Sequence, residues 1–340
     1  MERYWAIKQL YDDMPVVLAG LMSFFIGALC AYSVVLRGRK GALLDVPCHR
    51  SSHAVAIPRG GGVGIVVAFT ITGIVFTNQY AFIATAFLVG LLGFIDDAVD
   101  VSTYIRLIFQ IVLGCAMLLG SGFVIHSVRD GLLFVFFLIF IVATANFYNF
   151  MDGIDGIAGL CGIVAFGLLA CWTVIFEGYR DVVIIVYAVA FACMGFLVFN
   201  FPRARVFMGD VGSVFLGFVF AGLVVKIAHT PEEFLCVVLF MYPFYSDTLL
   251  TLYFRWRRGE NIIHAHRSHL YQLLVNELSI PHWKVSTVYA VVQLIAGLTS
   301  LAVYRRGVWV QALVAAVLVC AFLVTYNKIC KGVEIFHGHD

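Results

Sequence analysis

Residues 146–159 read Asn146-Phe-Tyr-Asn149-Phe-Met-Asp152-Gly-Ile-Asp155-Gly-Ile-Ala-Gly159 and lie where one long apolar run ends and another begins. A charged side chain at membrane depth costs at least about 2.5 kcal/mol unless it faces a wet cavity or a partner. A polar turn between two helices explains the Asp-Gly pairs. It does not explain two asparagines three residues apart on one face of the preceding helix. The stretch therefore predicts a helix-to-helix connection that also carries a functional site.

The composition of the whole chain indicates a membrane protein. Of its 340 residues, 62% are hydrophobic and only 12% are charged, whereas a soluble domain carries about 25% charged residues. The apolar residues form long continuous runs, which favour membrane-spanning helices over the alternating segments of a barrel. The nine cysteines lie mostly inside these runs and follow no disulfide or zinc spacing. The first run lacks a small-residue cleavage site, so we expect it to be a retained helix.

We expect an all-α, polytopic integral membrane protein with about eleven transmembrane helices. The run Tyr80 to Ile95 is short for a full crossing, which leaves ten spans as the alternative. The candidate runs are Pro15 to Leu36, Gly61 to Thr77, Tyr80 to Ile95, Ile105 to Ile125, Gly131 to Phe147, Ile157 to Phe176, Val182 to Phe201, Val211 to Ala228, Phe234 to Phe254, Val285 to Tyr304 and Val308 to Tyr326.

The distribution of basic residues predicts the orientation in the membrane. With the N-terminus outside and the C-terminus cytoplasmic, most of the 22 lysines and arginines fall in inside segments, which is the usual bias. This orientation also puts most of the membrane-level carboxylates at the cytoplasmic ends of helices. The basic residues left outside are Arg3, Lys8, Arg129, Arg180, Lys226, Arg305 and Arg306.

A cluster of carboxylates, Asp96-Asp97-Ala-Val-Asp100, follows the third apolar run. On a helix, Asp96 and Asp100 would share a face and Asp97 would point away. Clustered carboxylates repel one another, so we expect them beside a divalent cation, beside basic residues, or with one of them protonated. The alternative is an ordinary acidic first turn of a helix in a cytosolic loop.

The opening stretch carries the residue types that bind magnesium. Asn149, Asp152 and Asp155 are three residues apart, so they would line one side of the helix if it continued that far. Their oxygens are hard donors, and Mg²⁺ is commonly held by one or two carboxylates together with substrate phosphates.

Two glycine-rich segments have the composition of phosphate-binding loops. In Gly209-Asp-Val-Gly-Ser213, Asp210 could cap the following helix, and the free N–H groups of the same turn could bind an anion. The segment that begins at Asp45 leads to Arg59-Gly-Gly-Gly62, which fits either a loop that meets a phosphate or a close backbone contact.

The loop after the ninth run carries three histidines, His264, His266 and His269, together with Arg267. No cysteine or carboxylate arrangement completes a zinc site. An arginine with neighbouring histidines matches phosphate recognition better, because a guanidinium binds phosphoryl oxygens in pairs. Asp247, which follows Pro243 in the ninth run, is a remaining buried carboxylate, for which a hydrogen bond between helices is the simplest explanation.

Taken together, these segments resemble the polyprenyl-phosphate N-acetylhexosamine-1-phosphate transferase family, glycosyltransferase family 4. Four motifs and the histidine loop follow one another in the family's order: Arg59 to Gly62, Asp96 to Asp100, Asn146 to Gly156, Gly209 to Ser213, and the loop around His269. The resemblance implies a single transmembrane catalytic domain over residues 1–340. Its active site would be formed by cytoplasmic loops near 37–60, 96–104, 148–157, 202–211 and 255–284.

The resemblance also implies an activity and a role for each residue. The enzyme would transfer a sugar 1-phosphate from a UDP-N-acetylhexosamine, or a 6-deoxy derivative, to undecaprenyl phosphate with Mg²⁺ (Mn²⁺ as a substitute), releasing UMP. Asp210 and Asn149 would bind the metal, and Asp96, Asp97 and Asp210 would be catalytic. The remaining candidates would bind substrate: Asp152, Asp155, His266, Arg267, His269, Asn146, Arg59 and Asp45.

Two departures decide the branch of the family that the chain resembles. The histidine loop reads His-Arg-Ser-His-Leu-Tyr-Gln, and Asp100 stands where peptidoglycan-type members have lysine. Both favour the branch that initiates O-antigen or surface-polysaccharide synthesis, in the bacterial inner membrane, over the phospho-N-acetylmuramoyl-pentapeptide transferases. A secondary transporter is the alternative from a different class, but its carboxylates would lie at the midplane. We expect no nucleic-acid partner; the sugar, a homodimer and a covalent intermediate are left open.

Overall fold

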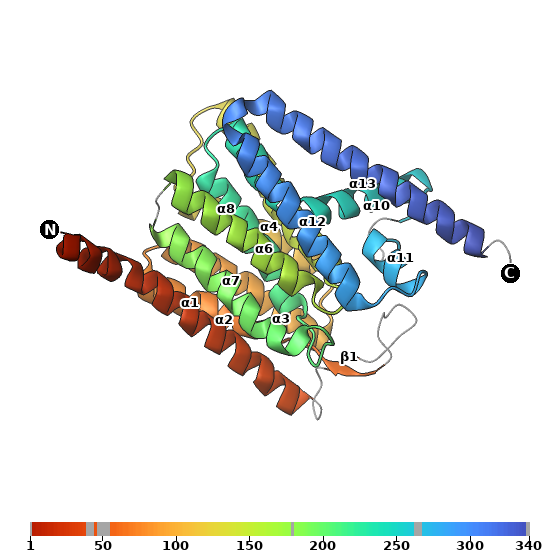
Figure 1. Cartoon of the computed structure of the whole chain (residues 1–340), viewed down its shortest axis with the longest axis horizontal. Helices are drawn as coiled ribbons and strands as arrows, with labels where there is room; N and C mark the ends of the chain where they lie inside the picture. The colour runs from red at the N-terminus through yellow and green to blue at the C-terminus, as the bar shows by residue number, and fades with distance from the viewer. Residues whose placement is uncertain (1, 39–43, 46–54, 178–179, 262–266, 338–340) are drawn as a thin grey trace.

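The computed structural model describes residues 2–38, 44–45, 55–177, 180–261 and 267–337, and these are almost entirely helical. The helices lie side by side in one bundle, with α1 and α13 on opposite outer sides (Figure 1). The elements are α1 Glu2–Gly38, β1 Leu44–Asp45, β2 Ile57–Pro58, α2 Val63–Phe76, α3 Tyr80–Val99, α4 Thr103–Gly120, α5 Val128–Phe150, α6 Ile157–Trp172, η1 Thr173–Glu177, α7 Arg180–Asn200, α8 Asp210–Ile227, α9 Pro231–Val238, η2 Leu239–Met241, α10 Tyr242–Arg257, α11 Leu270–Asn276, α12 His282–Val303, η3 Tyr304–Arg306 and α13 Val308–His337.

Ten helical segments of the described chain are long and apolar enough to cross a membrane. This confirms the predicted all-α, polytopic membrane fold. The prediction of which run is short was wrong. The helix that starts at Tyr80 continues through the acidic pair to Val99 and reaches 20 residues. The short helix is α2, whose 14 residues span about 21 Å of a hydrocarbon core about 30 Å thick.

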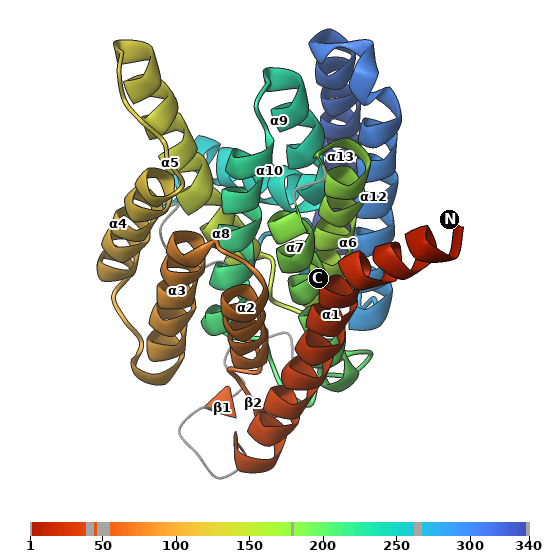
Figure 2. The same cartoon turned by 90° about the vertical axis from the view of Figure 1, so that its left-hand side faces the viewer.

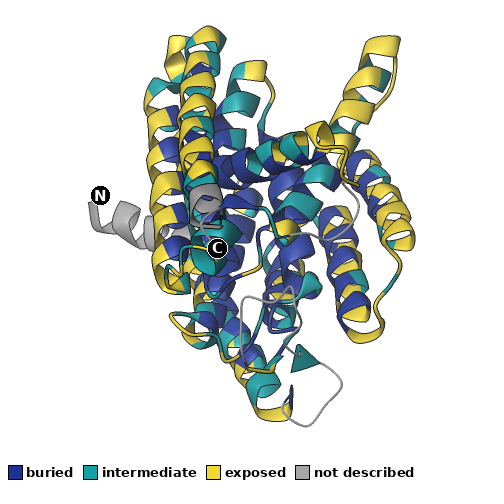
Figure 3. Cartoon of the chain, turned by 90° about the vertical axis from the view of Figure 1, so that its right-hand side faces the viewer, coloured by how far each residue is buried: buried dark blue, intermediate teal, exposed yellow. Residues whose placement is uncertain are grey.

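Helix α8 lies at the centre of the bundle and packs against α3 and α5 (Figure 2). In the most apolar 18-residue stretch of α8, 83% of the residues are buried, whereas the corresponding share in the outer helix α13 is 11%. Close approach depends on small residues: a Cβ at Gly93 of α3 would lie 2.5 Å from the Asp210 carbonyl oxygen, and one at Gly217 of α8 would lie 2.6 Å from the Thr144 oxygen of α5. Outer helices bury one face and expose apolar side chains on the other, as expected against lipid (Figure 3).

The ninth predicted run is a broken helix. It consists of α9, the 3₁₀ turn η2 and α10, with Pro243 in the first turn of α10, where a missing N–H costs least. The Gln293 side chain of α12 donates to the Phe240 carbonyl at the break, at 2.7 Å, and to the Cys161 carbonyl, at 2.9 Å. A carbonyl at the break is thereby satisfied inside the bundle, and α10 can carry Asp247 toward α11.

Candidate active site

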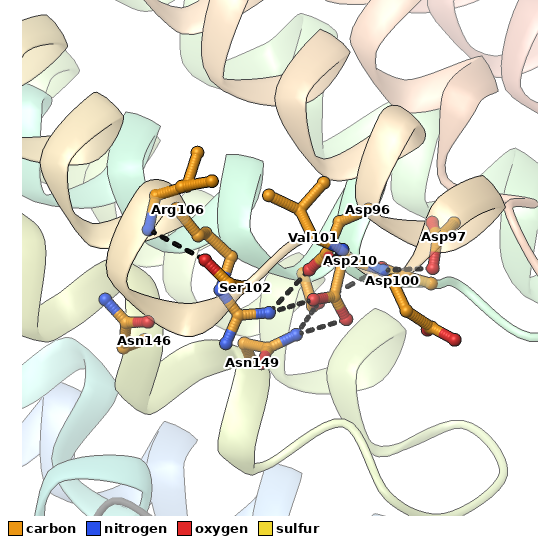
Figure 4. Close-up of polar contacts among 12 residues, drawn as sticks. Asp96, Asp97, Asp100, Val101, Ser102, Arg106, Asn146, Asn149 and Asp210 are labelled. Atoms are coloured by element: carbon orange, nitrogen blue, oxygen red, sulfur yellow. Dashed lines mark hydrogen bonds and ion pairs between the residues drawn. The ribbon is translucent and has the colours of Figure 1, made fainter.

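Two carboxylates and one arginine meet at one end of the bundle. Asp96 comes from the last turn of α3, Arg106 from the first turn of α4, and Asp210 is the first residue of α8. One guanidinium nitrogen, Arg106 Nη1, lies 2.6 Å from Asp96 Oδ2 and 2.6 Å from Asp210 Oδ2 (Figure 4). A single cation therefore bridges the acidic motif of one predicted loop to the Gly-Asp-x-Gly-Ser motif of another.

Asp97 caps the central helix. Its two carboxylate oxygens accept hydrogen bonds from the backbone N–H groups of Asp210 and Val211, each at 3.1 Å. The proposed capping role of Asp210 was therefore wrong: the N-cap residue is Gly209, and the capping carboxylate comes from α3. Gly209 has φ +75°, and a Cβ there would collide with Asp97 Oδ2, so the motif needs glycine at this position.

Asn149 joins the same cluster from the end of α5. Its Nδ2 donates to Asp210 Oδ1 at 2.8 Å and to Ser213 Oγ at 2.9 Å. Helix α5 ends at Phe150, one residue later. The condition for Asn149, Asp152 and Asp155 to line one helix face is therefore not met, and the two aspartates lie in the turn that follows.

Asp152 stays close to the cluster. Its side chain is partly buried between α5 and α6. Burial, and then the negative charges of Asp210 and Asp97, raise the pKa of Asp152 well above its usual value. A fourth carboxyl group therefore lies in the negative field at this end of the bundle, and that field favours its neutral, protonated form.

Asp155 faces a different neighbourhood. Its Oδ1 lies 3.4 Å from Nδ1 of His282, at the start of α12, and its carbonyl accepts a 2.7 Å hydrogen bond from Ser286. Asp155 and His282 line an open hollow of about 910 Å³, together with Val55, Ile57, Pro202, Arg203, Pro281 and Trp283. His282 could not be singled out from the sequence, because it lies in no motif.

Arg59 and the triple glycine lie beside the acidic pair. Arg59 Nη2 is 3.6 Å from Asp100 Oδ1. Asp100 does not share a helix face with Asp96, because α3 ends at Val99 and Asp100 is left-handed, with φ +51°. Its side chain is 91% exposed. The N–H groups of Gly61 and Gly62 donate to the carbonyls of Phe207 and Met208, both at 2.9 Å, so the close-backbone alternative holds for this loop.

The remaining predicted residues lie around this cluster. Asn146 lies one turn before Asn149 and donates to Gln110 Oε1 at 2.6 Å. Asp45 belongs to the two-residue strand β1, where it pairs with Ile57 of β2. Arg267 is partly buried and lies three residues before the start of α11. His266 lies outside the described residues.

His269 is held against the opening stretch. It is the N-cap residue of α11, and its ring lies 6.4 Å from the ring of Phe150, centroid to centroid. The Tyr271 hydroxyl donates to the Phe150 carbonyl at 2.9 Å. The histidine loop therefore packs on the residue that follows Asn149.

Arg106 is the residue of the cluster that sequence reasoning missed. The charge distribution along the sequence places it only among the basic residues of the inside segments. One signal could have identified it: a cation in the first turn of a helix faces the positive end of the helix dipole, so its position needs a compensating anion.

The cluster is suited to binding a phosphorylated ligand with a metal ion. Asp96, Asp210 and the Asn149 amide supply hard oxygen donors, which suit Mg²⁺. Asp97 is bonded through both oxygens to the backbone at the start of α8, so its role in the cluster is to hold that helix in place. Arg106 supplies a fixed positive charge in the same place, of the kind that binds phosphoryl oxygens.

Comparison with known proteins supports the same interpretation. The model of glycosyl transferase family 4 matches residues 79–228, which include the whole cluster. A phospho-N-acetylmuramoyl-pentapeptide-transferase of Streptococcus gordonii is 28% identical over 289 residues, covering 76% of this chain and 88% of that protein. An undecaprenyl-phosphate alpha-N-acetylglucosaminyl 1-phosphate transferase of Yersinia pestis is 27% identical over 258 residues, 69% of this chain and 70% of the relative.

The homologous enzyme of Escherichia coli, which has the same name as the Yersinia protein, extends the match further. It is 25% identical over 313 residues, covering 85% of this chain and 84% of that protein. These relatives support a transferase of the multi-pass bacterial membrane type that acts on a polyprenyl phosphate. The four motifs, the helical membrane fold and these matches together support glycosyl transferase family 4 as the family that this chain resembles.

Proposed function

We propose that this protein transfers N-acetylhexosamine 1-phosphate, or a 6-deoxy derivative, from a UDP-sugar to undecaprenyl phosphate. The products are undecaprenyl-diphosphate-sugar and UMP, and the reaction would initiate surface-polysaccharide or O-antigen synthesis. The observation that carries the proposal is the bridge of Asp96, Arg106 and Asp210, with Asn149 bonded to it, at one end of the helix bundle. We place this end at the cytoplasmic face of the bacterial inner membrane, following the basic-residue bias.

Phosphoryl transfer depends mostly on positioning and on charge stabilisation. The donor oxygens of Asp210 and Asn149 would hold Mg²⁺, with Mn²⁺ as a substitute, and the ion would neutralise charge on the pyrophosphate. Arg106 would bind phosphoryl oxygens from the same wall of the site. Asp152, Asp155, Arg267 and His269 would hold the nucleotide-sugar, with Asp155 in the hollow beside His282.

The geometry separates the two members of the acidic pair. Both oxygens of Asp97 are engaged by the first N–H groups of α8. Asp96 faces Arg106 through Oδ2 and the Val101 N–H through Oδ1. Both carboxylates are fully hydrogen-bonded, but Asp97 is bonded to the backbone of α8, whereas Asp96 is bonded to Arg106, the cation that would meet the phosphates. We therefore assign to Asp96 the task of keeping the lipid phosphate deprotonated for direct attack, and to Asp97 the positioning of Asp210. Trapping a labelled phospho-enzyme from the UDP-sugar alone would overturn the direct route in favour of a covalent one.

A second candidate is the transfer of phospho-N-acetylmuramoyl-pentapeptide. It is favoured by the similarity to the Streptococcus gordonii enzyme of that name. The two activities differ only in the donor, so a donor panel separates them.

The test is an assay of the purified protein with undecaprenyl phosphate, Mg²⁺ and a panel of UDP-N-acetylhexosamines plus UDP-N-acetylmuramoyl-pentapeptide. We expect UMP release and a lipid-linked sugar with at least one N-acetylhexosamine donor. Asp210→Ala should abolish it, whereas Asp130→Ala, in the first turn of α5 and outside the site, should not. Turnover with the muramoyl-pentapeptide donor alone would replace the first candidate by the second, and no turnover with any donor would refute both.

A further inference from the structure

A second hollow lies at the end of the bundle opposite the acidic cluster. It has a volume of about 680 Å³ and is lined by residues from the start of α3, the end of α4, the start of α7 and the end of α8. Lys226 lines it from the last turn of α8, and Asp210 is the first residue of that helix, so the two residues lie about 24 Å apart along its axis. The hollow is therefore separate from the candidate active site.

Cationic side chains converge on this hollow from two helices. Arg180 is the first residue of α7, Lys226 lies in the last turn of α8, and His229 follows α8. The carboxylate among the described lining residues is Asp181, whose Oδ2 accepts from the backbone and from a side chain of the turn before α3, at 3.2 Å and 3.1 Å. The described lining therefore has a net charge of +1 with the histidine neutral, and its negative charge is already hydrogen-bonded.

Both cations are exceptions to the charge bias of the chain. Arg180 and Lys226 are among the few basic residues that the predicted orientation leaves outside. The helix dipole explains Lys226, which lies at the negative end of α8, but not Arg180, which lies at the positive end of α7. An anionic ligand shared by the two side chains accounts for both positions.

Short helices place the hollow at the depth of lipid headgroups. Helix α2 has 14 residues, and α4 and α8 have 18 each. These helices are about 21 Å and about 27 Å long, in a hydrocarbon core about 30 Å thick. Helix α5, with 23 residues, extends past the ends of α3 and α4 (Figure 2). The bundle is therefore recessed here, and a bilayer thins beside short spans, so its headgroups reach the recess.

Another part of the lining is apolar. Phe123, which follows α4, and Val225 of α8 are partly buried and line the hollow together with the basic residues. An inorganic anion gains nothing from such a wall, whereas a lipid can bury its glycerol and first acyl carbons against it. A guanidinium and an ammonium both bind phosphate oxygens. A phosphodiester with one negative charge also balances the net charge of the lining.

We propose that this hollow binds a membrane phospholipid with an anionic phosphodiester headgroup. Arg180 and Lys226 contact the phosphate, and the apolar wall contacts the glycerol end of the acyl chains. The site lies at the end of the bundle that we assign to the outer face, opposite the transfer site. Its occupation requires no turnover, so the inference does not depend on the proposed function.

The test is a lipid titration of the full-length protein in detergent, read by native mass spectrometry. The probes are phosphatidylglycerol, phosphatidylethanolamine and phosphatidylcholine with the same acyl chains, and we expect the protein to bind phosphatidylglycerol most tightly. The double variant Arg180→Gln/Lys226→Gln should raise the Kd for phosphatidylglycerol about 25-fold, since each basic residue beside an anionic headgroup contributes about fivefold. The charge-retaining variant Arg180→Lys/Lys226→Arg should stay within about threefold of the parent.

The matched control is Arg305→Gln/Arg306→Gln, which removes two charges from η3, outside the hollow. It should leave the Kd within about twofold, because distant surface charges are screened. Equal affinity for the three lipids, or equal losses in the two glutamine double variants, would show a non-specific attraction and overturn the proposal.

A free anion is distinguished from a lipid by competition. If millimolar inorganic phosphate displaces phosphatidylglycerol completely, the hollow is an anion site and the lipid proposal is wrong. The parent and the variants should have the same apparent Tm in lipid-free detergent, so that lost binding is not lost folding. If the glutamine double variant does not accumulate, the two single variants are titrated instead, and each should raise the Kd about fivefold; an unchanged Kd in both would refute the site.

Discussion

Replacing Arg106 by glutamine tests the central bridge. The guanidinium makes two 2.6 Å contacts with carboxylates, and the three side chains are only 17%, 9% and 27% exposed. Removing one partner of a buried pair costs about 3–5 kcal/mol, because the remaining charge is left uncompensated. Since Asp210 is partly open to solvent, we take the lower end, about 3 kcal/mol. At about 2 °C per kcal/mol the apparent Tm should fall by about 6 °C.

The pH dependence gives the sharper measurement. In the parent protein, acid protonates the carboxylates and removes the attraction to Arg106, so stability falls as the pH drops. In Arg106→Gln, acid removes the repulsion between Asp96 and Asp210. The difference in apparent Tm between the parent and the variant should therefore shrink as the pH is lowered from 8 to 5. Both are compared by thermal unfolding in detergent with EDTA, and Mg²⁺ should restore part of the loss in the variant.

The matched control is Arg129→Gln, an exposed arginine in the first turn of α5. It should change the apparent Tm by less than about 1 °C, since exposed surface changes usually cost no more than about 0.5 kcal/mol. If Arg106→Gln matches this control at every pH, the two carboxylates are not bridged by Arg106 and the reasoning fails.

Three further predictions follow from the same geometry. Asp97→Asn should destabilise the protein by about 1–3 kcal/mol in thermal unfolding. An amide has one acceptor oxygen, so it cannot accept from both the Asp210 and the Val211 N–H groups that the carboxylate satisfies. An equal loss of stability in Asp97→Glu would contradict the capping role. Gly209→Ala should cost at least about 1 kcal/mol, from the positive φ and the clash with Asp97, whereas Gly259→Ala, also at positive φ but in open space, should cost less. For Asp152, the folded-state pKa is raised, so the parent loses stability as the pH rises through that value. Asp152→Asn should therefore gain stability relative to the parent between pH 4 and pH 8 in EDTA, and a difference that does not change with pH would contradict this.

The sequence was sufficient to predict the spans, because apolar runs of about 20 residues have few other uses. It also identified the carboxylates and amides that meet at the site, though not Arg106, since buried carboxylates and amides at span ends stand out in so apolar a chain. It did not identify the partners of those residues. Whether Asp97 caps α8 or lines the site depends on how α3 packs against α8. That packing depends on close contacts between Gly93 and Asp210 and between Asp97 and Gly209, and the two members of each contact are more than 100 residues apart in the sequence. The i, i+4 argument for Asp100 failed because α3 ends one residue earlier.

The placement of charge on the helices argues that the bridge is present for chemistry. Asp96 lies in the last turn of α3, and Arg106 lies in the first turn of α4. Each therefore faces the end of its helix dipole that disfavours its charge, at a cost of about 0.3–1 kcal/mol per residue. Selection for stability alone would exchange the two, or replace both by apolar side chains, since buried ion pairs are often no better than an apolar contact. Asp210, at the start of α8, has the favourable placement that Asp96 and Arg106 lack. The proposed function would require the site to hold a metal ion and several phosphate oxygens, and so to place both signs of charge at the same depth. The placement of Asp96 and Arg106 brings both charges to Asp210.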